Sequence, residues 1–356
     1  MSEEKSITIE TYDEEYFEDL NEISIPTAND IFSLLFCSNK VTMTIKLLDR
    51  IFVKSQKPAV LLATLQSDKK INISDSIIQK LSSKIDKKFI YDAIEKLQQA
   101  KYAIKITEEK KSIKGEIEWN KKLSKIDGFA KYICHFSCLD DLSRYGYNIE
   151  KFPIESTITL CDTDKNTNHY MMISEYIEGP TLLTYLEKHE YTKDQLFSII
   201  SQILYSFIIA YEKMEFVHND VNFKNFLIQY TTVKTRQFVF KNNNPVIVFF
   251  EGIKPMIIDF GNVEDYPNLD SFFDSINNFL ENIQRYDKKY NTRFFKSRND
   301  FDNKIKSIDD LIKWRQNDFK IENNIGGKII KMIKSKKCKC GTRLIKNHRK
   351  CTKCRK

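Results

Sequence analysis

The sequence contains little glycine and proline. Only 9 glycines and 7 prolines occur among 356 residues, which excludes collagen-like and low-complexity chains. The first glycine in the chain is Gly115. Any turn before Gly115 must therefore be built from residues that have a side chain. Such side chains crowd a turn whose backbone approaches a ligand closely.

The chain also has no basic and apolar leader at its start. Residues 1–25 contain nine acidic residues and one base, whereas a secretory signal begins with a positive region, so we expect no such signal. The best membrane candidate is the uncharged stretch Gln195–Tyr211, which includes several serines and glutamines. Because it is short for a bilayer span, we expect a buried helix and no transmembrane segment.

The eight cysteines show no regular disulfide spacing. Four are scattered and four cluster near the C-terminus, at Cys338, Cys340, Cys351 and Cys354. This distribution favours a reducing, intracellular location in the cytoplasm or nucleus over a secreted disulfide framework.

The net charge of +8 comes from the C-terminal tail. Residues 323–356 contain 13 bases and no acid, and subtracting these 13 charges from +8 leaves −5 for residues 1–322. The whole chain is 41% hydrophobic, enough for a packed core. The tail predicts binding to nucleic acid or to an acidic partner, with a solvated charge run as the alternative.

The order of the apolar patterns predicts an α+β fold with two segregated lobes. We expect an acidic arm and a helical extension over residues 1–75, including a helix that begins at Pro58. Short strand-like runs follow at Ile77–Leu81, Phe89–Ala93 and Tyr102–Ile106. A helix is expected over Glu116–Leu123, and another around Leu196–Tyr211.

Two segments contain the residue types that phosphate chemistry needs. One is His218-Asn219-Asp220, with Asn225 five residues after the aspartate, and the other is Asp259-Phe260-Gly261. Both follow apolar residues, and together they resemble the catalytic loop and the metal-binding motif of the protein-kinase fold. The resemblance implies that Asp220 orients the attacking hydroxyl, and that Asn225 and Asp259 bind Mg²⁺ through oxygen atoms.

The same resemblance implies an ATP site in the first lobe. Lys105 of Tyr102-Ala103-Ile104-Lys105 would neutralise the phosphates of ATP, and Glu116 would pair with it, with Glu118 as the alternative. Ile173–Gly179 resembles the hinge between the lobes. Ser174 would be the gatekeeper there, and the backbones of Glu175 and Ile177 would bind adenine.

The sequence departs from the usual kinase pattern at several points. By position, Ser83, Ile85 and Lys88 stand where the glycines of the nucleotide loop are expected. Asn219 replaces the usual arginine, which argues against control by a phosphorylated activation loop. Asn222 occupies the position of the usual lysine, and Lys224 is a substitute for it.

The region around the second motif is also unusual. It is preceded by an insertion that predicts a strand pair, Gln237–Phe240 and Val246–Phe250, and a helix begins soon after it near Asp270 or Asp274. These features resemble haspin-like kinases and compact RIO-type kinases. The His-Asn-Asp motif is also similar to the corresponding motif of serine/threonine kinases of large DNA viruses. A viral origin would imply host cytoplasm or virion as the location.

The cysteine cluster in the tail resembles a zinc ribbon. Cys338 and Cys340 form one close pair and Cys351 and Cys354 another, a spacing that suits a tetrahedral Zn²⁺ site, with His348 as an alternative ligand. The tail contains no aromatic residue, so base stacking is not expected.

These features predict three regions: the arm and extension at 1–75, a bilobal kinase-like domain at 76–325 (lobes 76–174 and 179–325), and a basic zinc-binding tail at 326–356. The expected activity is transfer of the γ-phosphate of Mg-ATP to serine or threonine hydroxyls of a protein. The alternatives are a small-molecule kinase of the aminoglycoside-phosphotransferase type, a pseudokinase scaffold, and a nucleic-acid-binding module formed by the tail.

Overall fold

The computed structural model describes most of the chain between Met43 and Ile321 and one short strand before it. The described residues are 7–9, 43–52, 59–65, 71–73, 75–82, 85–107, 110–136, 157–160, 170–241, 245–264 and 266–321. The chain divides into two compact units, each described separately below. Unit 1 comprises Met1–Glu178 with Ile258–Asn262, and unit 2 comprises Gly179–Ile257 with Val263–Lys356.

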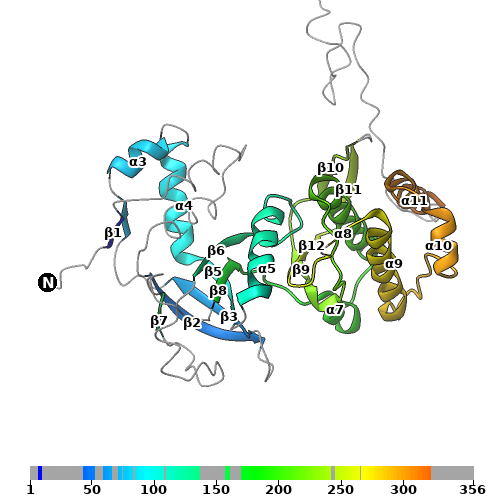
Figure 1. Ribbon diagram of the computed structural model, residues 1–356, viewed down its shortest axis with the longest axis horizontal. Coiled ribbons are helices and arrows are strands. Elements are labelled where there is room, and N and C mark those ends of the chain that lie inside the picture. Colours follow the sequence, from blue (N-terminus) through cyan, green and yellow to red (C-terminus); the bar gives the residue numbers. More distant parts are fainter. Residues whose placement is uncertain are drawn as a thin grey trace, which may run out of the picture. The chain divides into compact units, whose positions relative to one another are not determined.

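Unit 1 is built on a six-stranded antiparallel sheet with the order β6-β8-β5-β3-β2-β7 (Figure 1). Its strands are β2 (Met43–Phe52), β3 (Ala59–Leu65), β5 (Lys101–Thr107), β6 (Tyr132–Phe136), β7 (Thr157–Leu160) and β8 (Tyr170–Glu175). A separate parallel pair joins β1 (Ile7–Ile9) to β4 (Ile71–Ile73). The strand that carries Lys105 is therefore central, with β3 on one side and β8 on the other.

Three helices of unit 1 lie between these strands in the chain: α3 (Asp75–Ser82), α4 (Lys87–Gln99) and α5 (Lys110–Leu123). Helix α4 begins at Asp86, whose Oδ1 accepts hydrogen bonds from the backbone N–H groups of Lys88 and Phe89. Ile90 and Ala93 on its inner face are buried. This helix packs against β3 of the sheet, and α3 packs against α4.

The structure corrects three of the expected elements. Ile77–Leu81 and Phe89–Ala93 are helical, because short apolar runs suit either structure and Asp86 provides a helix cap. The helix expected from Pro58 is wrong, since Ala59–Leu65 is a strand paired on both sides, with β2 and β5. Pairing on both edges outweighs the helical propensity of its alanines and leucines.

These corrections also change the boundary expected at residue 76. The strands β2 and β3 belong to the sheet that contains Lys105, so part of the 1–75 region is integral to the sheet of unit 1. Cys134, on β6, is the cysteine that lies within the described ranges, and it is buried and disulfide-bonded.

Unit 2 is mainly helical. Its helices are α7 (Leu182–Lys188), α8 (Lys193–Met214), α9 (Leu269–Tyr286), α10 (Arg298–Lys304) and α11 (Ile308–Ile321). Its strands form two antiparallel pairs, β9 (Phe226–Tyr230) with β12 (Ile253–Ile257) and β10 (Thr235–Phe238) with β11 (Val246–Phe249). The second pair confirms the strand pair predicted for the insertion.

Helix α8 is the central element of unit 2. It begins at Thr192 in a capping box with Gln195, and it ends at Glu215, which adopts a left-handed conformation. It is long and apolar enough to span a membrane, but 78% of its most apolar window is buried within the fold. The stretch Gln195–Tyr211 is thus a buried helix, as its polar residues predicted.

Candidate active site

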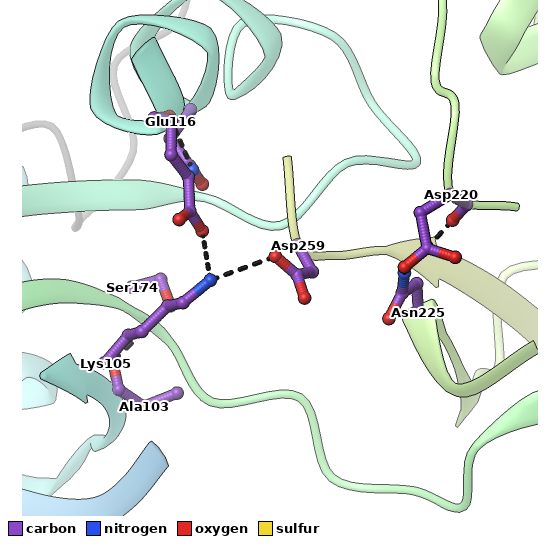
Figure 2. Close-up of polar contacts among 8 residues, drawn as sticks. Ala103, Lys105, Glu116, Ser174, Asp220, Asn225 and Asp259 are labelled. Atoms are coloured by element: carbon purple, nitrogen blue, oxygen red, sulfur yellow. Dashed lines mark hydrogen bonds and ion pairs between the residues drawn. The ribbon is translucent and has the colours of Figure 1, made fainter. Parts of the chain in front are cut away.

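Three charged side chains far apart in the sequence meet in unit 1 (Figure 2). The Nζ of Lys105 lies 2.7 Å from Oε1 of Glu116 and 2.9 Å from Oδ1 of Asp259. The side chains of Lys105 and Glu116 are 14% and 6% exposed, whereas that of Asp259 is 45% exposed. One cation therefore joins a buried carboxylate to a carboxylate that faces solvent.

The local structure explains how Lys105 and Glu116 meet. Lys105 lies on β5 between Val60 of β3 and Met172 of β8, which holds its backbone on both sides. Glu116 lies on α5, where Ile117 packs against Met172. The sequence left Glu118 as an alternative partner, but Glu118 is exposed, and the ion pair is made by Glu116.

Burial and charge shift the pKa values of this pair. Burial alone would lower the pKa of Lys105, but the charges of Glu116 and Asp259 and the hydrogen bonds to them outweigh it and raise that pKa. Burial raises the pKa of Glu116, and Lys105 opposes this rise. The lysine is thus held firmly in its charged form, and the buried carboxylate depends on it.

The Asp259-Phe260-Gly261 segment is held tightly within unit 1. Asp259 has a φ of 64°, a left-handed conformation that an aspartate tolerates better than most residues. Phe260 is 1% exposed, and its ring centroid lies 5.8 Å from that of Phe129. A Cβ at Gly261 would lie 3.3 Å from Oε2 of Glu116, so glycine lets the segment pack against the ion pair.

The second predicted motif forms a compact loop in unit 2. The Nδ2 of Asn225 donates to the carbonyl oxygen of Asp220 and to its Oδ2, both at 3.0 Å (Figure 2). The backbone N–H of Asp220 lies 3.3 Å from Nδ1 of His218. Because the amide nitrogen of Asn225 is used in this way, its Oδ1 is the atom left to act as a ligand.

His218 braces this loop from within, as the sequence predicted. Its ring contacts Phe207 and Phe216, and its carbonyl oxygen accepts a 2.6 Å hydrogen bond from Oγ of Ser275 on α9. Asp270 and Asp274, the acids noted near the start of this helix, are exposed, and Asp274 pairs with Arg298. Sequence reasoning missed Ser275, although it lies on the buried face of a strongly amphipathic helix.

The predicted hinge residues lie at the end of β8 and directly after it, within unit 1 up to Glu178. The backbone N–H of Glu175 donates to the carbonyl of Lys131, and Tyr176 donates to Lys101. Ser174 on β8 pairs with Ala103, and its Oγ lies 3.4 Å from the carbonyl oxygen of Ala103. Ile177 is buried, and its backbone groups form no hydrogen bond with the part of the chain that is described.

The remaining predicted residues do not join these clusters. Ile85 lies in the turn between α3 and α4, not between two strands of the sheet, so its assignment to a nucleotide loop is wrong, and Ser83 lies outside the described residues. Lys88 lies in α4 and is exposed. Lys224 is exposed beside Asn225, and its backbone N–H donates to Oδ1 of Asn222.

The zinc-ribbon prediction falls on residues that the structure does not describe. The four tail cysteines, Cys338, Cys340, Cys351 and Cys354, and His348 lie outside the described ranges. Among the residues within those ranges, no group of three or more histidine, cysteine or acidic side chains is arranged to hold a metal ion. Magnesium needs fewer protein ligands, and the oxygens of Asn225 and Asp259 are of the hard type that it prefers.

Comparison with known proteins agrees with the chemistry of these residues. Residues 144–294 match the family described as ABC1 atypical kinase-like domain, a range that includes Asp220, Asn225 and Asp259. The chain is also 33% identical over 79 residues to a probable serine/threonine-protein kinase of Dictyostelium discoideum. That similarity covers 22% of this chain and 6% of the relative. Taken with the Lys105–Glu116–Asp259 cluster, the two matches support a protein-kinase-like domain and the chemistry of a phosphotransferase.

Proposed function

We propose that this protein transfers the γ-phosphate of Mg-ATP to serine or threonine hydroxyls of a protein substrate. In this proposal Lys105 neutralises phosphate charge and Glu116 holds Lys105 in place. Asn225 and Asp259 bind Mg²⁺, and the carboxylate of Asp220 orients the attacking hydroxyl. Bound Mg-ATP supplies the phosphoryl group and the metal charge that offsets the negative charge developed during transfer.

The observation that carries the proposal is the double ion pair of Lys105. A lysine that needed only one partner for stability would be satisfied by Glu116 at 2.7 Å. Its second contact reaches Asp259, whose side chain is 45% exposed, so part of this charge cluster faces solvent. A cation at this position, with its pKa raised, is suited to bind an anionic phosphate.

The catalytic loop supports the role proposed for Asp220. Asn225 donates to both the backbone and the side chain of Asp220, which fixes the orientation of the carboxylate before substrate binds. A carboxylate that is already oriented loses little entropy when it accepts a proton or a hydrogen bond from a hydroxyl. The same contact directs Oδ1 of Asn225 away from Asp220, as a metal ligand requires.

The hinge is suited to hold an adenine ring. The N–H of Glu175 is already bonded to Lys131, whereas Ile177 has backbone groups without a described partner. We propose that adenine binds these backbone groups, with Ser174 limiting the depth of the site. In this proposal β3, which pairs with β5, and β2, which pairs with β3, cover the nucleotide in place of Ser83 and Ile85.

The test is transfer of radiolabelled γ-phosphate from Mg-ATP to generic protein acceptors and to the chain itself. We expect labelled protein with the wild type and at least a ~100-fold lower rate with Asp220→Ala, because positioned acid–base groups contribute that much. Asp92→Ala, an exposed acid on α4, is the matched control and retains the wild-type rate. Equal labelling by wild type and Asp220→Ala would refute the role given to Asp220.

A small-molecule kinase is the second candidate, and one observation favours it. Only the short segment Asn262–Asn268 separates Gly261 from α9, and Asn222 replaces the lysine usual in protein kinases. A protein substrate has little activation segment to bind against in such a site. ATP consumption without protein labelling, stimulated by small hydroxyl compounds, would favour this candidate. ATP binding without turnover would favour a pseudokinase scaffold.

We also propose that the tail binds Zn²⁺ through its four cysteines and binds nucleic acid or an acidic partner through its bases. The supporting features are the two close cysteine pairs and the 13 positive charges of residues 323–356. Loss of nucleic-acid retention on deletion of residues 326–356 would support the second part. Retention that is unchanged by this deletion would contradict it.

A further inference from the structure

The segment that follows Asp259 is bonded to the residues that directly precede Asp220. Val263 forms an isolated antiparallel bridge with His218, and the N–H of Glu264 donates to the carbonyl of Val217 at 3.1 Å. The side chains add a third contact, because Nδ2 of Asn219 donates to Oε2 of Glu264 at 3.1 Å. The five residues that make these contacts belong to unit 2.

The other carboxylate oxygen of Glu264 bonds its own segment. The N–H of Tyr266 lies 3.5 Å from Oε1 of Glu264, a weak contact two residues along the chain. One carboxylate thus links the catalytic loop on one side to the chain leading into α9 on the other. We call Asn219 and Glu264 together the amide–carboxylate latch.

The latch lies beside one of two backbone pairings that join the loop containing Asp220 to the chain on either side of Ile258–Asn262. At one end, Ile257 pairs with Phe226 in the β12–β9 ladder. At the other end, Val263 pairs with His218. Ile257 and Val263, which flank the segment Ile258–Asn262 in the chain, are therefore paired with the two ends of the loop that contains Asp220 and Asn225. Loosening either pairing would loosen both the loop and the segment.

From these contacts we infer that Glu264 is a positioning residue, which acts through Asn219 to hold Asp220 and the segment after Asp259 in register. This inference rests on the proposed phosphotransfer. The negative charge in this contact comes from the carboxylate of Glu264, which is part of the chain, and its hydrogen-bond donor is the neutral amide of Asn219. The segment therefore needs no added phosphate for its order, and the active form is the unmodified chain.

The chemistry of the latch allows a reversal of donor and acceptor. Asn219→Asp places a second carboxylate against Glu264, and the two repel. Adding Glu264→Gln to that variant supplies an amide donor for the carboxylate introduced at position 219, so the contact is restored with its direction reversed. Glu264→Ala removes the contact, and Glu187→Ala, an exposed acid on α7, is the control with the same change of charge.

The first measurement is the kinetics of phosphate transfer by the full chain. We expect kcat to fall about tenfold in Glu264→Ala and in Asn219→Asp, equivalent to about 1.4 kcal/mol, with KM for Mg-ATP unchanged. The reversed pair recovers most of kcat, and phosphatase treatment of the wild type leaves kcat unchanged. A reversed pair no faster than Asn219→Asp, or a wild type inactivated by phosphatase, would overturn the inference.

The second measurement is amide hydrogen exchange over residues 258–267, which does not depend on activity. We expect faster exchange at Glu264 in the two single variants, and protection in the reversed pair and in Glu187→Ala. Unchanged protection in Glu264→Ala would overturn the inference. If the wild type transfers no phosphate, the proposed function fails, and the exchange data alone then decide whether Glu264 anchors the segment.

Discussion

Replacing Lys105 with methionine removes the cation that Glu116 and Asp259 share and leaves Glu116 buried without its partner. Coulomb's law with an effective dielectric constant of about 20 gives about 6 kcal/mol for a contact at the 2.7 Å between Lys105 and Glu116. Desolvation of both groups offsets part of this. The second contact adds about 0–1 kcal/mol, because Asp259 is 45% exposed and screened by water.

We therefore expect Lys105→Met to lower the free energy of unfolding of unit 1 by about 3 kcal/mol at pH 8, in the range typical of a broken buried pair. The loss depends on pH. Without Lys105, the pKa of Glu116 rises further above its ordinary value, since burial already raises it. A folded-state pKa above the unfolded one stabilises the protein at low pH, and this stabilisation is lost as pH rises through the folded-state pKa. The deficit relative to wild type should therefore shrink between pH 8 and pH 5.

The assay uses the two tryptophans of the chain, of which Trp119 lies in unit 1 and Trp314 in unit 2. In a Trp314→Phe background, the fluorescence of Trp119 follows urea unfolding of unit 1 alone. Adding Glu116→Gln to Lys105→Met should restore most of the stability and remove the pH dependence of the difference. A deficit below about 1 kcal/mol that is equal at pH 8 and pH 5 would refute the buried ion pair as the cause.

Three further predictions concern other parts of the chain. Gly179→Ala should destabilise unit 2 by more than about 4 kcal/mol in urea unfolding, because a Cβ there would lie 2.0 Å from the carbonyl oxygen of Ile228 and φ is +155°; a loss below about 1 kcal/mol would show that the backbone adapts. Burial, aided by the charge of Lys121, lowers the pKa of His135 to about 4. The unfolded histidine titrates near pH 6.5, so stability should fall as pH drops from about 6.5 toward 4, and His135→Gln should flatten that part of a thermal-shift profile; an unchanged slope would contradict this. Purified wild type should contain one zinc ion per chain by elemental analysis, and Cys354→Ser should lose it; zinc-free wild type would reject the ribbon.

The sequence predicted those elements whose signals are local. Helix α8 has a capping residue, Thr192, and a long run of apolar residues, and both are legible without tertiary contacts. The insertion before Asp259 was likewise recognisable as two short apolar runs around the turn at Asn242–Pro245. Lys105 and Glu116 were placed by the resemblance of Tyr102–Lys105 to the third strand of kinases and by the helix expected after it.

The sheet of unit 1 was predicted less well, because the chain has no glycine before Gly115. Without a glycine loop to mark the first two strands, the sequence pattern assigned Ser83 and Ile85 to that loop. Ile85 lies between α3 and α4, and Ser83 is outside the described residues. Strand β3 resembles a helix start in isolation and becomes a strand through its neighbours on both sides. Such pairing between distant segments leaves no mark in a single stretch of sequence.

Contacts that support the site were also beyond sequence reasoning. Phe129, Ser275 and Glu264 contact the predicted motifs from other elements, and none belongs to a recognisable pattern. In the sequence alone, neither Ser275 on α9 nor Glu264, four residues after Phe260, shows any sign of a contact with the catalytic loop. Only the three-dimensional structure shows that their partners are the carbonyl of His218 and the amide of Asn219.

The return of Ile258–Asn262 to unit 1 has a consequence for synthesis of the protein on the ribosome. Lys105 and Asp259 are 154 residues apart in the chain. At translation rates of about 5–20 residues per second, Lys105 is made roughly 8 to 30 seconds before Asp259. During this interval the nascent first unit contains Lys105 and Glu116 but no residue to complete their cluster. The last part of unit 1 is thus supplied only after β12 of unit 2 has been synthesised, and the two units cannot mature strictly one after the other.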